Sequence, residues 1–188
     1  MKMSRILDYS GIDRLSEHKV ADIYAVTCVH IKPFVNWLNE YLPKFEINTP
    51  LRLAAFLAQI GHESGRMRYV EEIASGRAYE GRKDLGNTQK GDGCRFKGRG
   101  LIQITGRANY TELSNDVGVD FVSQPMLLSL PEYAVMSACW FWKSRGLNEL
   151  ADQGRFRDIT RKINGGYNGL EDREKLYERA KRMLNIKV

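Results

Sequence analysis

Apolar residues recur at helical spacing along most of the 188-residue chain, which predicts a mainly helical protein. One example lies between Pro33, which is expected to begin a helix, and Pro43, which is expected to end it. Four large apolar residues in this interval fall at positions i, i+3, i+4 and i+7: Phe34, Trp37, Leu38 and Tyr41. They would share one face of the helix and pack against a core.

An almost continuous apolar segment, residues 51–61, predicts a buried central helix. Thr49 and Pro50 supply its start, because threonine caps helix N-termini and proline favours the first helical position. Gly65 supplies a stop. Glu63 therefore falls at the helix C-terminus, where the negative end of the helix dipole favours a protonated carboxyl group.

Glycine interrupts the chain repeatedly between residues 75 and 100, which predicts a long irregular segment, followed by a short extended run at 101–105. Further helices are expected over about residues 107–114, 131–145, 148–153, 155–163 and 170–185. The expected fold class is mainly α, with at most a small β element near the middle of the chain. Residues 1–188 contain no low-complexity linker and are expected to form one domain.

The chain carries a formal net charge of +6 and a sequence pI of about 9.2, which favours anionic partners. Most of the excess lies in residues 82–107, where seven Lys or Arg accompany two Asp. Few aromatic residues are interleaved with these cations, so no nucleic-acid partner is expected. The last helix holds further cations within residues 171–188 and is a candidate contact for anionic lipid or lipopolysaccharide.

Three cysteines stand far apart in the sequence, at Cys28, Cys94 and Cys139, which favours free thiols and synthesis in a reducing compartment. No Cys or His spacing matches a metal site, so no metal and no cofactor are expected. No apolar run is long enough to span a membrane, and residues 1–13 lack the apolar core of a signal peptide. We expect a monomer made in the cytoplasm without a signal peptide.

Acidic residues close to the buried helix indicate acid–base chemistry. Hydrolysis of a glycosidic bond uses one protonated carboxyl group as the acid and one ionised carboxylate on the other side of the bond. Glu63 has the apolar setting that suits the acid. Glu71, Glu72 and Glu80 are candidates for the second carboxylate, and their spacing alone does not choose among them.

Two motifs resemble glycoside hydrolase family nineteen, which holds chitinases and the lysozyme-like endolysins of bacteriophages. The first is His-Glu-Ser-Gly at residues 62–65, and the second is the long run at 97–110. An Asn-Gly-Gly turn at 164–166 follows in the same order. The resemblance covers roughly residues 50–180. It implies a lysozyme-like helical fold with a deep cleft, and hydrolysis with inversion at the anomeric carbon.

The resemblance also implies roles for individual residues. Glu63 corresponds to the general acid, and Glu72, nine residues later, to the general base of the compact bacterial members, with Glu80 in reserve. Thr105 corresponds to the residue that holds the attacking water. The residues implied to contact substrate are Gln103, Asn109, Asn164 and Arg173. Arg173 resembles the arginine that organises the carboxylates, and we expect it beside Glu72.

The expected substrate is peptidoglycan, cut at the β-1,4 bond between N-acetylmuramic acid and N-acetylglucosamine so that bacterial cells lyse. The basic segment, the compact single domain and the missing signal favour this endolysin over a chitinase. The family implies release through a holin pore before the enzyme reaches the wall. Two alternatives are open: a chitinase acting on β-1,4 N-acetylglucosamine polymers, and a basic module that binds wall or membrane without catalysis.

Overall fold

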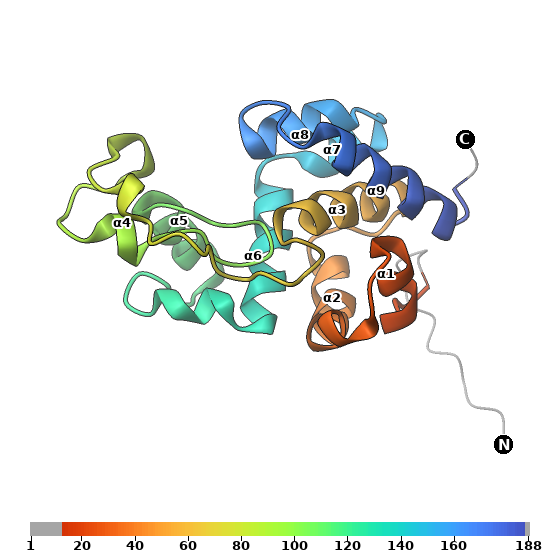
Figure 1. Cartoon of the computed structure of the whole chain (residues 1–188), viewed down its shortest axis with the longest axis horizontal. Coiled ribbons are helices and arrows are strands. Elements are labelled where there is room, and N and C mark those ends of the chain that lie inside the picture. Colours follow the sequence, from red (N-terminus) through yellow and green to blue (C-terminus); the bar gives the residue numbers. More distant parts are fainter. Residues whose placement is uncertain (1–12, 187–188) are drawn as a thin grey trace, which may run out of the picture.

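The computed structural model describes residues 13–186, and this part of the chain is mainly helical, as the sequence predicts (Figure 1). Its α-helices are α1 (Glu17–Tyr24), α2 (Lys32–Lys44), α3 (Pro50–Glu63), α4 (Asp92–Arg95), α5 (Arg107–Val117), α6 (Pro131–Ser144), α7 (Leu147–Asp152), α8 (Phe156–Asn164) and α9 (Leu170–Met183). Short 3-10 helices are η1 (Cys28–His30), η2 (Arg77–Tyr79), η3 (Lys83–Leu85) and η4 (Pro125–Ser129).

The elements form two groups joined by α6. Figure 1 shows α1, α2 and α3 with α7, α8 and α9 on one side, and α4 and α5 with their long loops on the other. The long loops belong to the glycine-rich part of the sequence, which forms only short helical turns. The residues that the sequence singles out for chemistry therefore lie where the helical group continues into the loop group.

The helix α3 is the centre of the core. Thr49 Oγ1 accepts a hydrogen bond from Arg52 N at 3.3 Å, which confirms the predicted cap. Residues 53–61 are buried on all sides, as expected for a segment that is apolar all round. The four large apolar side chains within residues 53–61, Leu53, Phe56, Leu57 and Ile60, are fully buried. Each such side chain stabilises the fold by about 1.5–3 kcal/mol.

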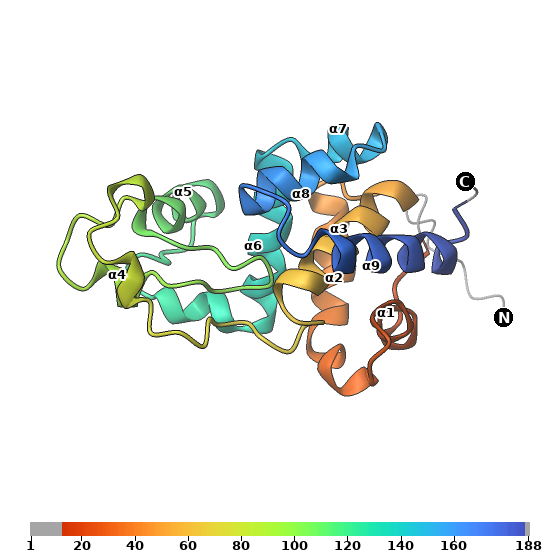
Figure 2. The same cartoon turned by 45° about the horizontal axis from the view of Figure 1, so that its top comes forward.

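Two helices pack closely on this core. α9 runs alongside α3 (Figure 2), and its Leu176 and Ala180 are buried, as the apolar spacing predicts. α6 packs on α2, and its Trp142 meets Phe56 of α3 edge to face with ring centroids 5.4 Å apart. α3 is therefore held by helices that come late in the chain.

The end of α2 differs from the prediction. Pro43 was expected to stop the helix, but α2 continues through it to Lys44. Pro43 has no N–H to donate to the carbonyl four residues back, so α2 loses one helical hydrogen bond there and ends one residue later.

The predicted extended run at 101–105 is also different, because the chain turns there. Gly100 and Gln103 both have positive φ angles, of 80° and 58°, which reverse the backbone. The only β pairing within residues 13–186 is two isolated antiparallel bridges, Glu71 to Arg99 and Arg99 to Ile104. These bridges set the segment that follows α3 beside the glycine-rich motif.

Candidate active site

The carboxyl group of Glu63, the last residue of α3, is fixed by an arginine from α9. Arg173 Nη2 donates a hydrogen bond to Glu63 Oε1, and the two side chains form an ion pair. The Arg173 side chain is 1% exposed and that of Glu63 is 20% exposed. The arginine thus pairs with Glu63 and not, as expected from the sequence, with Glu72.

The other two nitrogens of Arg173 are also used. Nη1 donates to Gln59 Oε1 at 2.5 Å, and Nε donates to the carbonyl of Asn168 at 3.2 Å. Gln59 is fully buried, and its amide donates to Thr160 Oγ1 at 2.8 Å. A chain of satisfied polar groups therefore runs from α8 through α3 and α9 to Glu63, and it makes this carboxyl group rigid.

Asp172 on α9 holds two residues on either side of Glu63. Its Oδ2 lies 2.7 Å from His62 Nδ1, and its Oδ1 accepts from Arg66 Nη2 at 2.5 Å. Burial acts to raise the pKa of the Asp172 carboxyl, but the hydrogen bonds from Arg66 and His62 outweigh burial and lower the pKa. The imidazole of His62 packs on Gly169, where an added Cβ would lie 2.2 Å from His62 Cε1.

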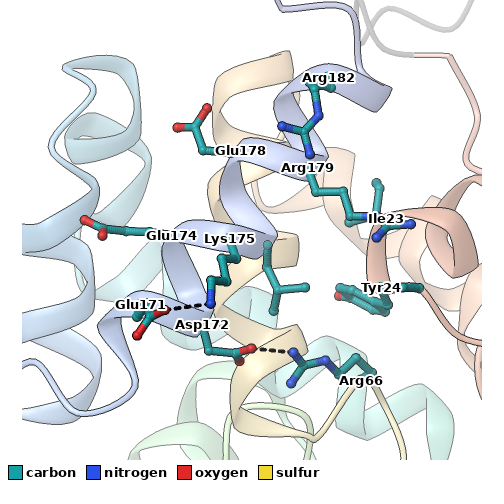
Figure 3. A pocket seen from close by; sticks show the side chains of 12 residues that line it. Ile23, Tyr24, Arg66, Glu171, Asp172, Glu174, Lys175, Glu178, Arg179 and Arg182 are labelled. Carbon is teal, nitrogen blue, oxygen red and sulfur yellow. Dashed lines mark hydrogen bonds and ion pairs between the residues drawn. The ribbon is translucent and has the colours of Figure 1, made fainter.

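A surface pocket of about 510 Å³ lies between α1 and α9, and the pair of Arg66 and Asp172 stands in its wall (Figure 3). Apolar side chains from both helices line it together with charged side chains of both signs. Neither Glu63 nor Glu72 lines this pocket. It is therefore separate from the candidate acid and base.

Glu71 and Glu72 have different partners, although they are adjacent. Glu71 Oε1 lies 3.0 Å from Lys97 Nζ and 3.2 Å from Arg99 Nη2, whose side chain is 5% exposed. Burial acts to raise the pKa of Glu71, and the hydrogen bond from Lys97 together with the charge of Arg99 reverses this and lowers the pKa. Glu71 is thus a structural counter-ion for the basic segment.

Glu72 is held at both carboxylate oxygens. Gly98 N donates to Glu72 Oε2 at 3.1 Å, and the phenol of Tyr79 donates to Oε1 at 3.1 Å. The backbone also pairs here, because Glu72 N donates to the carbonyl of Gly98 at 2.9 Å. Of the three candidate bases, Glu72 is the one whose carboxylate accepts from the backbone N–H of Gly98 in the long second motif.

Three of the predicted site residues converge on Gly98. A Cβ added at Gly98 would lie 2.8 Å from Gln103 Oε1, 3.3 Å from Thr105 Oγ1 and 3.4 Å from Glu72 Oε2. Only a residue without a side chain leaves these three polar groups so close to one another. The carboxylate, the hydroxyl and the amide therefore share one small site.

A short series of backbone contacts orients this group. Thr105 Oγ1 donates to the carbonyl of Gln103 at 2.9 Å, and Asn109 Nδ2 donates to the carbonyl of Thr105 at 2.7 Å. Gln103 Nε2 donates to the carbonyl of Gly100 at 2.9 Å. The turn that replaces the expected extended run is what brings Gln103 and Thr105 toward Glu72. Asn109 lies one helical turn further, with Oδ1 at 3.5 Å from Arg145 Nη2.

Glu80, the reserve candidate, is bound within its own loop. Its carboxylate accepts from the backbone N–H groups of Gly91 at 2.7 Å and Gly93 at 2.9 Å. These two hydrogen bonds lower the pKa of Glu80. The geometry assigns Glu80 to loop anchoring rather than to the group around Gly98.

Asn164, the last residue of α8, lies close to the arginine network. Its Nδ2 donates to the carbonyl of Asn168 at 3.3 Å, the same carbonyl that accepts from Arg173 Nε. Its Oδ1 is buried and has no hydrogen-bond partner among the residues that the structure describes.

Most of the cations of residues 82–107 have partners within the fold. Arg107 pairs with the buried Asp92 at 2.5 Å, and Arg95 donates to the carbonyl of Val122 at 2.9 Å. Arg82 pairs with Asp84, and Lys97 and Arg99 share Glu71. Five of the seven cations are therefore accounted for by contacts within the fold.

The cations of α9 are similarly engaged. Arg179 Nε donates to the carbonyl of Asp22 at 2.6 Å, and Lys181, with a side chain that is 15% exposed, pairs with Glu178. No helix within the described part of the chain is long and apolar enough to cross a membrane. Contact of α9 with anionic lipid stays a prediction.

Sequence reasoning did not single out Gln59, Asp172 or Tyr79. Gln59 had a signal, because a polar residue inside an apolar helix requires a buried partner. Asp172 and Tyr79 had none, since their partners are set by the tertiary fold. Within residues 13–186, no three His, Cys, Asp or Glu side chains gather as they would around a metal ion.

Comparison with known proteins gives matches over most of this region. Residues 47–151 match the family profile described as chitinase class I of glycoside hydrolase family 19. A glycosyl hydrolase family 19 domain-containing protein of Haemophilus influenzae is 34% identical over 206 aligned residues, which cover 93% of this chain and 96% of that protein. An endochitinase of Arabidopsis thaliana is 40% identical over 115 residues, which cover 61% of this chain and 39% of that protein.

Solved structures of chitinases share the fold. A bacterial family 19 chitinase superposes with a TM-score of 0.74 and 21% identity, over 93% of this chain and 97% of that chain. A family 19, class IV chitinase from Zea mays gives a TM-score of 0.72 and 23% identity, over 92% and 94% of the two chains. The arrangement of helices around the candidate site is thus similar to that of these proteins.

Proposed function

Because the chain belongs to glycoside hydrolase family 19, we propose that it cleaves a β-1,4 glycosidic bond with Glu63 as general acid and Glu72 as general base. The chain is a chitinase-like glycoside hydrolase, so a purely binding module is disfavoured. The observation that carries the assignment of the base is the convergence of Glu72, Gln103 and Thr105 on Gly98. Glu71 and Glu80 are committed to structural contacts instead.

The proposed reaction is a single displacement. Glu63 gives its proton to the glycosidic oxygen as the bond from that oxygen to the anomeric carbon breaks. Water attacks the anomeric carbon from the opposite face and loses a proton to Glu72, while Thr105 orients that water. The products are a new non-reducing end and a reducing sugar of inverted configuration. An inverting pair requires carboxyl groups about 6.5–9.5 Å apart, which leaves room for the water.

Other residues are proposed to hold the sugar chain. Gln103 and Asn109 would donate hydrogen bonds from the loop group, and Asn164 would contact the sugar chain from the helical group. Arg173 would keep the Glu63 carboxyl group in place for proton transfer. Positioning of this kind contributes a large part of enzymatic rate enhancement.

We propose peptidoglycan as the substrate, with cleavage between N-acetylmuramic acid and N-acetylglucosamine and lysis of bacterial cells. The net charge of +6 supports an acidic polymer. On this proposal the protein is an endolysin that is made in the cytoplasm and is released through a holin. Most of the cations of residues 82–107 are paired within the fold, so the support for an anionic substrate comes from the charge of the whole protein and not from that segment.

Chitin is the second candidate. The observation that favours it is the 40% identity to a protein named endochitinase. Chitin and peptidoglycan glycan share β-1,4-linked N-acetylhexosamines, so one pair of carboxylates serves either polymer. The difference lies in the lactyl group and peptide of muramic acid, which only a peptidoglycan hydrolase must accommodate.

Digestion of both polymers, followed by mass spectrometry, separates these substrates. New reducing muramic ends from purified wall support the peptidoglycan proposal, whereas release of chitin oligomers without wall cleavage supports the chitinase. Intact glycan in both digests contradicts the function altogether. Glu63→Gln should abolish cleavage with the fold intact, and Glu40→Gln, an exposed glutamate on α2 paired with Lys44, is the matched control. Proton NMR of the first product should show the inverted anomer.

A further inference from the structure

Tyr79 in η2 reaches out of the glycine-rich loop to the proposed base. Its phenol donates to Glu72 Oε1 at 3.1 Å, and the residue is half-buried. Burial raises the pKa of Tyr79, and the hydrogen bond to Glu72 raises it further. The phenol is therefore a neutral donor throughout the pH range in which a glycosidase works.

The two donors to Glu72 occupy different oxygens. Gly98 N takes Oε2, and Tyr79 takes Oε1. An ionised carboxylate has about four acceptor sites, so lone pairs are left for a water and its proton. Because the two donors come from separate segments and bind different oxygens, they fix the plane of the Glu72 carboxylate. They leave its other acceptor positions open.

The loop that carries Tyr79 is itself firmly anchored. Asn87, which is fully buried, donates from Nδ2 to the carbonyl of Tyr79 at 2.9 Å and accepts from Arg107 N at 2.8 Å. The next residue, Glu80, holds two backbone N–H groups of the same loop through its carboxylate. The long glycine-rich segment thus delivers a phenol to one defined place.

We propose that Tyr79 is a positioning residue that orients the Glu72 carboxylate and, as a hydrogen-bond donor to it, supports its action as the base. This inference rests on the proposed function of Glu72. It gives the loop a role in the reaction, beyond support of the fold. A hydrogen bond donated to the charged form of an acid favours that form.

The test is the pH dependence of kcat/KM for Tyr79→Phe on a soluble oligosaccharide of β-1,4 N-acetylglucosamine and on purified wall. The acidic limb of this profile reports a base that must be ionised in the free enzyme. We expect the limb to move to higher pH by about 0.5–1 unit, with a smaller loss on the high-pH plateau. A residue that only supports the loop would change Tm and leave the limb where it is.

Tyr41→Phe is the matched control, because Tyr41 donates to Glu132 Oε1 at 3.0 Å in a contact of the same kind between α2 and α6. It should leave the limb unmoved. Replacement of Tyr79 by 3-fluorotyrosine, a stronger donor of nearly the same shape, keeps the fold and should move the limb to lower pH. An unmoved limb in both Tyr79 variants overturns the inference.

Glu72→Gln distinguishes this failure from that of the proposed function. If Glu72→Gln is inactive and the limb of Tyr79→Phe is unmoved, only the role of Tyr79 is wrong. If Glu72→Gln keeps wild-type activity, the base has been misassigned, and the inference about Tyr79 fails with it.

Discussion

Arg173 and Glu63 are 110 residues apart in the sequence and form an ion pair at the junction of α9 and α3. The arginine is buried, whereas the carboxylate retains some exposure. A buried cation that is also bonded to Gln59 and Asn168 has little freedom to move. The position of the candidate acid is therefore decided by the last helix of the chain.

This arrangement predicts a cost for Arg173→Lys. A lysine keeps the charge but lacks the planar fork that bonds three acceptors at once. The free energy of unfolding should fall by about 1–3 kcal/mol because Gln59 loses a buried partner. Activity should fall about 100-fold because Glu63 is less well positioned. Chemical denaturation and a turbidity assay measure the two effects.

Arg157→Lys provides the control for that substitution. Arg157 pairs with Glu174 at the surface, where the two side chains are 71% and 38% exposed. Replacing Arg157 by lysine at this exposed ion pair should change the free energy of unfolding by less than about 0.5 kcal/mol. Equal effects of the two substitutions would show that the buried network does not hold Glu63.

The adjacent glutamates should respond differently to the same substitution. Glu72→Gln should reduce kcat about 100- to 10,000-fold with little change in Tm, because it removes the base. Glu71→Gln should lower Tm, since Arg99 and Lys97 lose their counter-ion, and should keep activity within about ten-fold of wild type. The reverse pattern would exchange the roles assigned to these residues.

Gly98→Ala should impair activity more than stability. The new Cβ would crowd Gln103 at 2.8 Å and press on Thr105 and Glu72. Since these side chains can shift by a few tenths of an ångström, the free energy of unfolding should fall by less than about 1.5 kcal/mol. Displacement of the base should lower kcat at least about ten-fold. Unchanged kcat would mean that the group around Gly98 does not take part in the reaction.

Acid stability should depend on Asp92. The hydrogen bond from Arg107 lowers the pKa of this buried carboxyl below its usual value of 3.8, in spite of burial. In the unfolded chain Asp92 takes up its proton at higher pH than in the folded protein, so folding is favoured while both forms are ionised. The contribution is complete above about pH 4 and is lost as the pH falls through the lowered pKa of the folded state.

Asp92→Asn should therefore be less stable than wild type at neutral pH and should change less in stability between about pH 4 and about pH 2. Urea unfolding at several pH values measures this difference. Parallel curves for the two proteins would indicate that the pair of Asp92 and Arg107 contributes nothing to acid sensitivity.

The sequence predicted the helices well where local signals were strong. Thr49, Pro50 and the apolar residues after them defined α3, and its burial followed from the lack of a polar face. The run at 101–105 was misjudged because its apolar and β-branched residues suit a strand, while the positive φ of Gln103 has no local signature. Which carboxylate Arg173 would meet was also beyond local reasoning, since both lie about a hundred residues away.

The site residues came from motifs, and the structure adds their surroundings. The resemblance to the family assigned the base to Glu72. Residue spacing alone did not separate Glu72 from Glu71, because both residues follow α3 at nearly the same distance. The charge count of segment 82–107 favoured anionic partners, although several of its cations pair with residues such as Glu71 and Asp92 in the fold. Composition records charges and not their pairing.

The isolated bridge between Glu71 and Arg99 has a consequence for the length of this segment. In extended backbone, consecutive side chains point to opposite sides, so inserting or deleting a single amino acid between α3 and the bridge would exchange which glutamate accepts from Gly98 N. The number of residues between α3 and the bridge thus fixes which side chain faces the site. Engineered length changes should be tolerated at exposed Gly118 or Gly154 and rejected between Glu63 and Glu72.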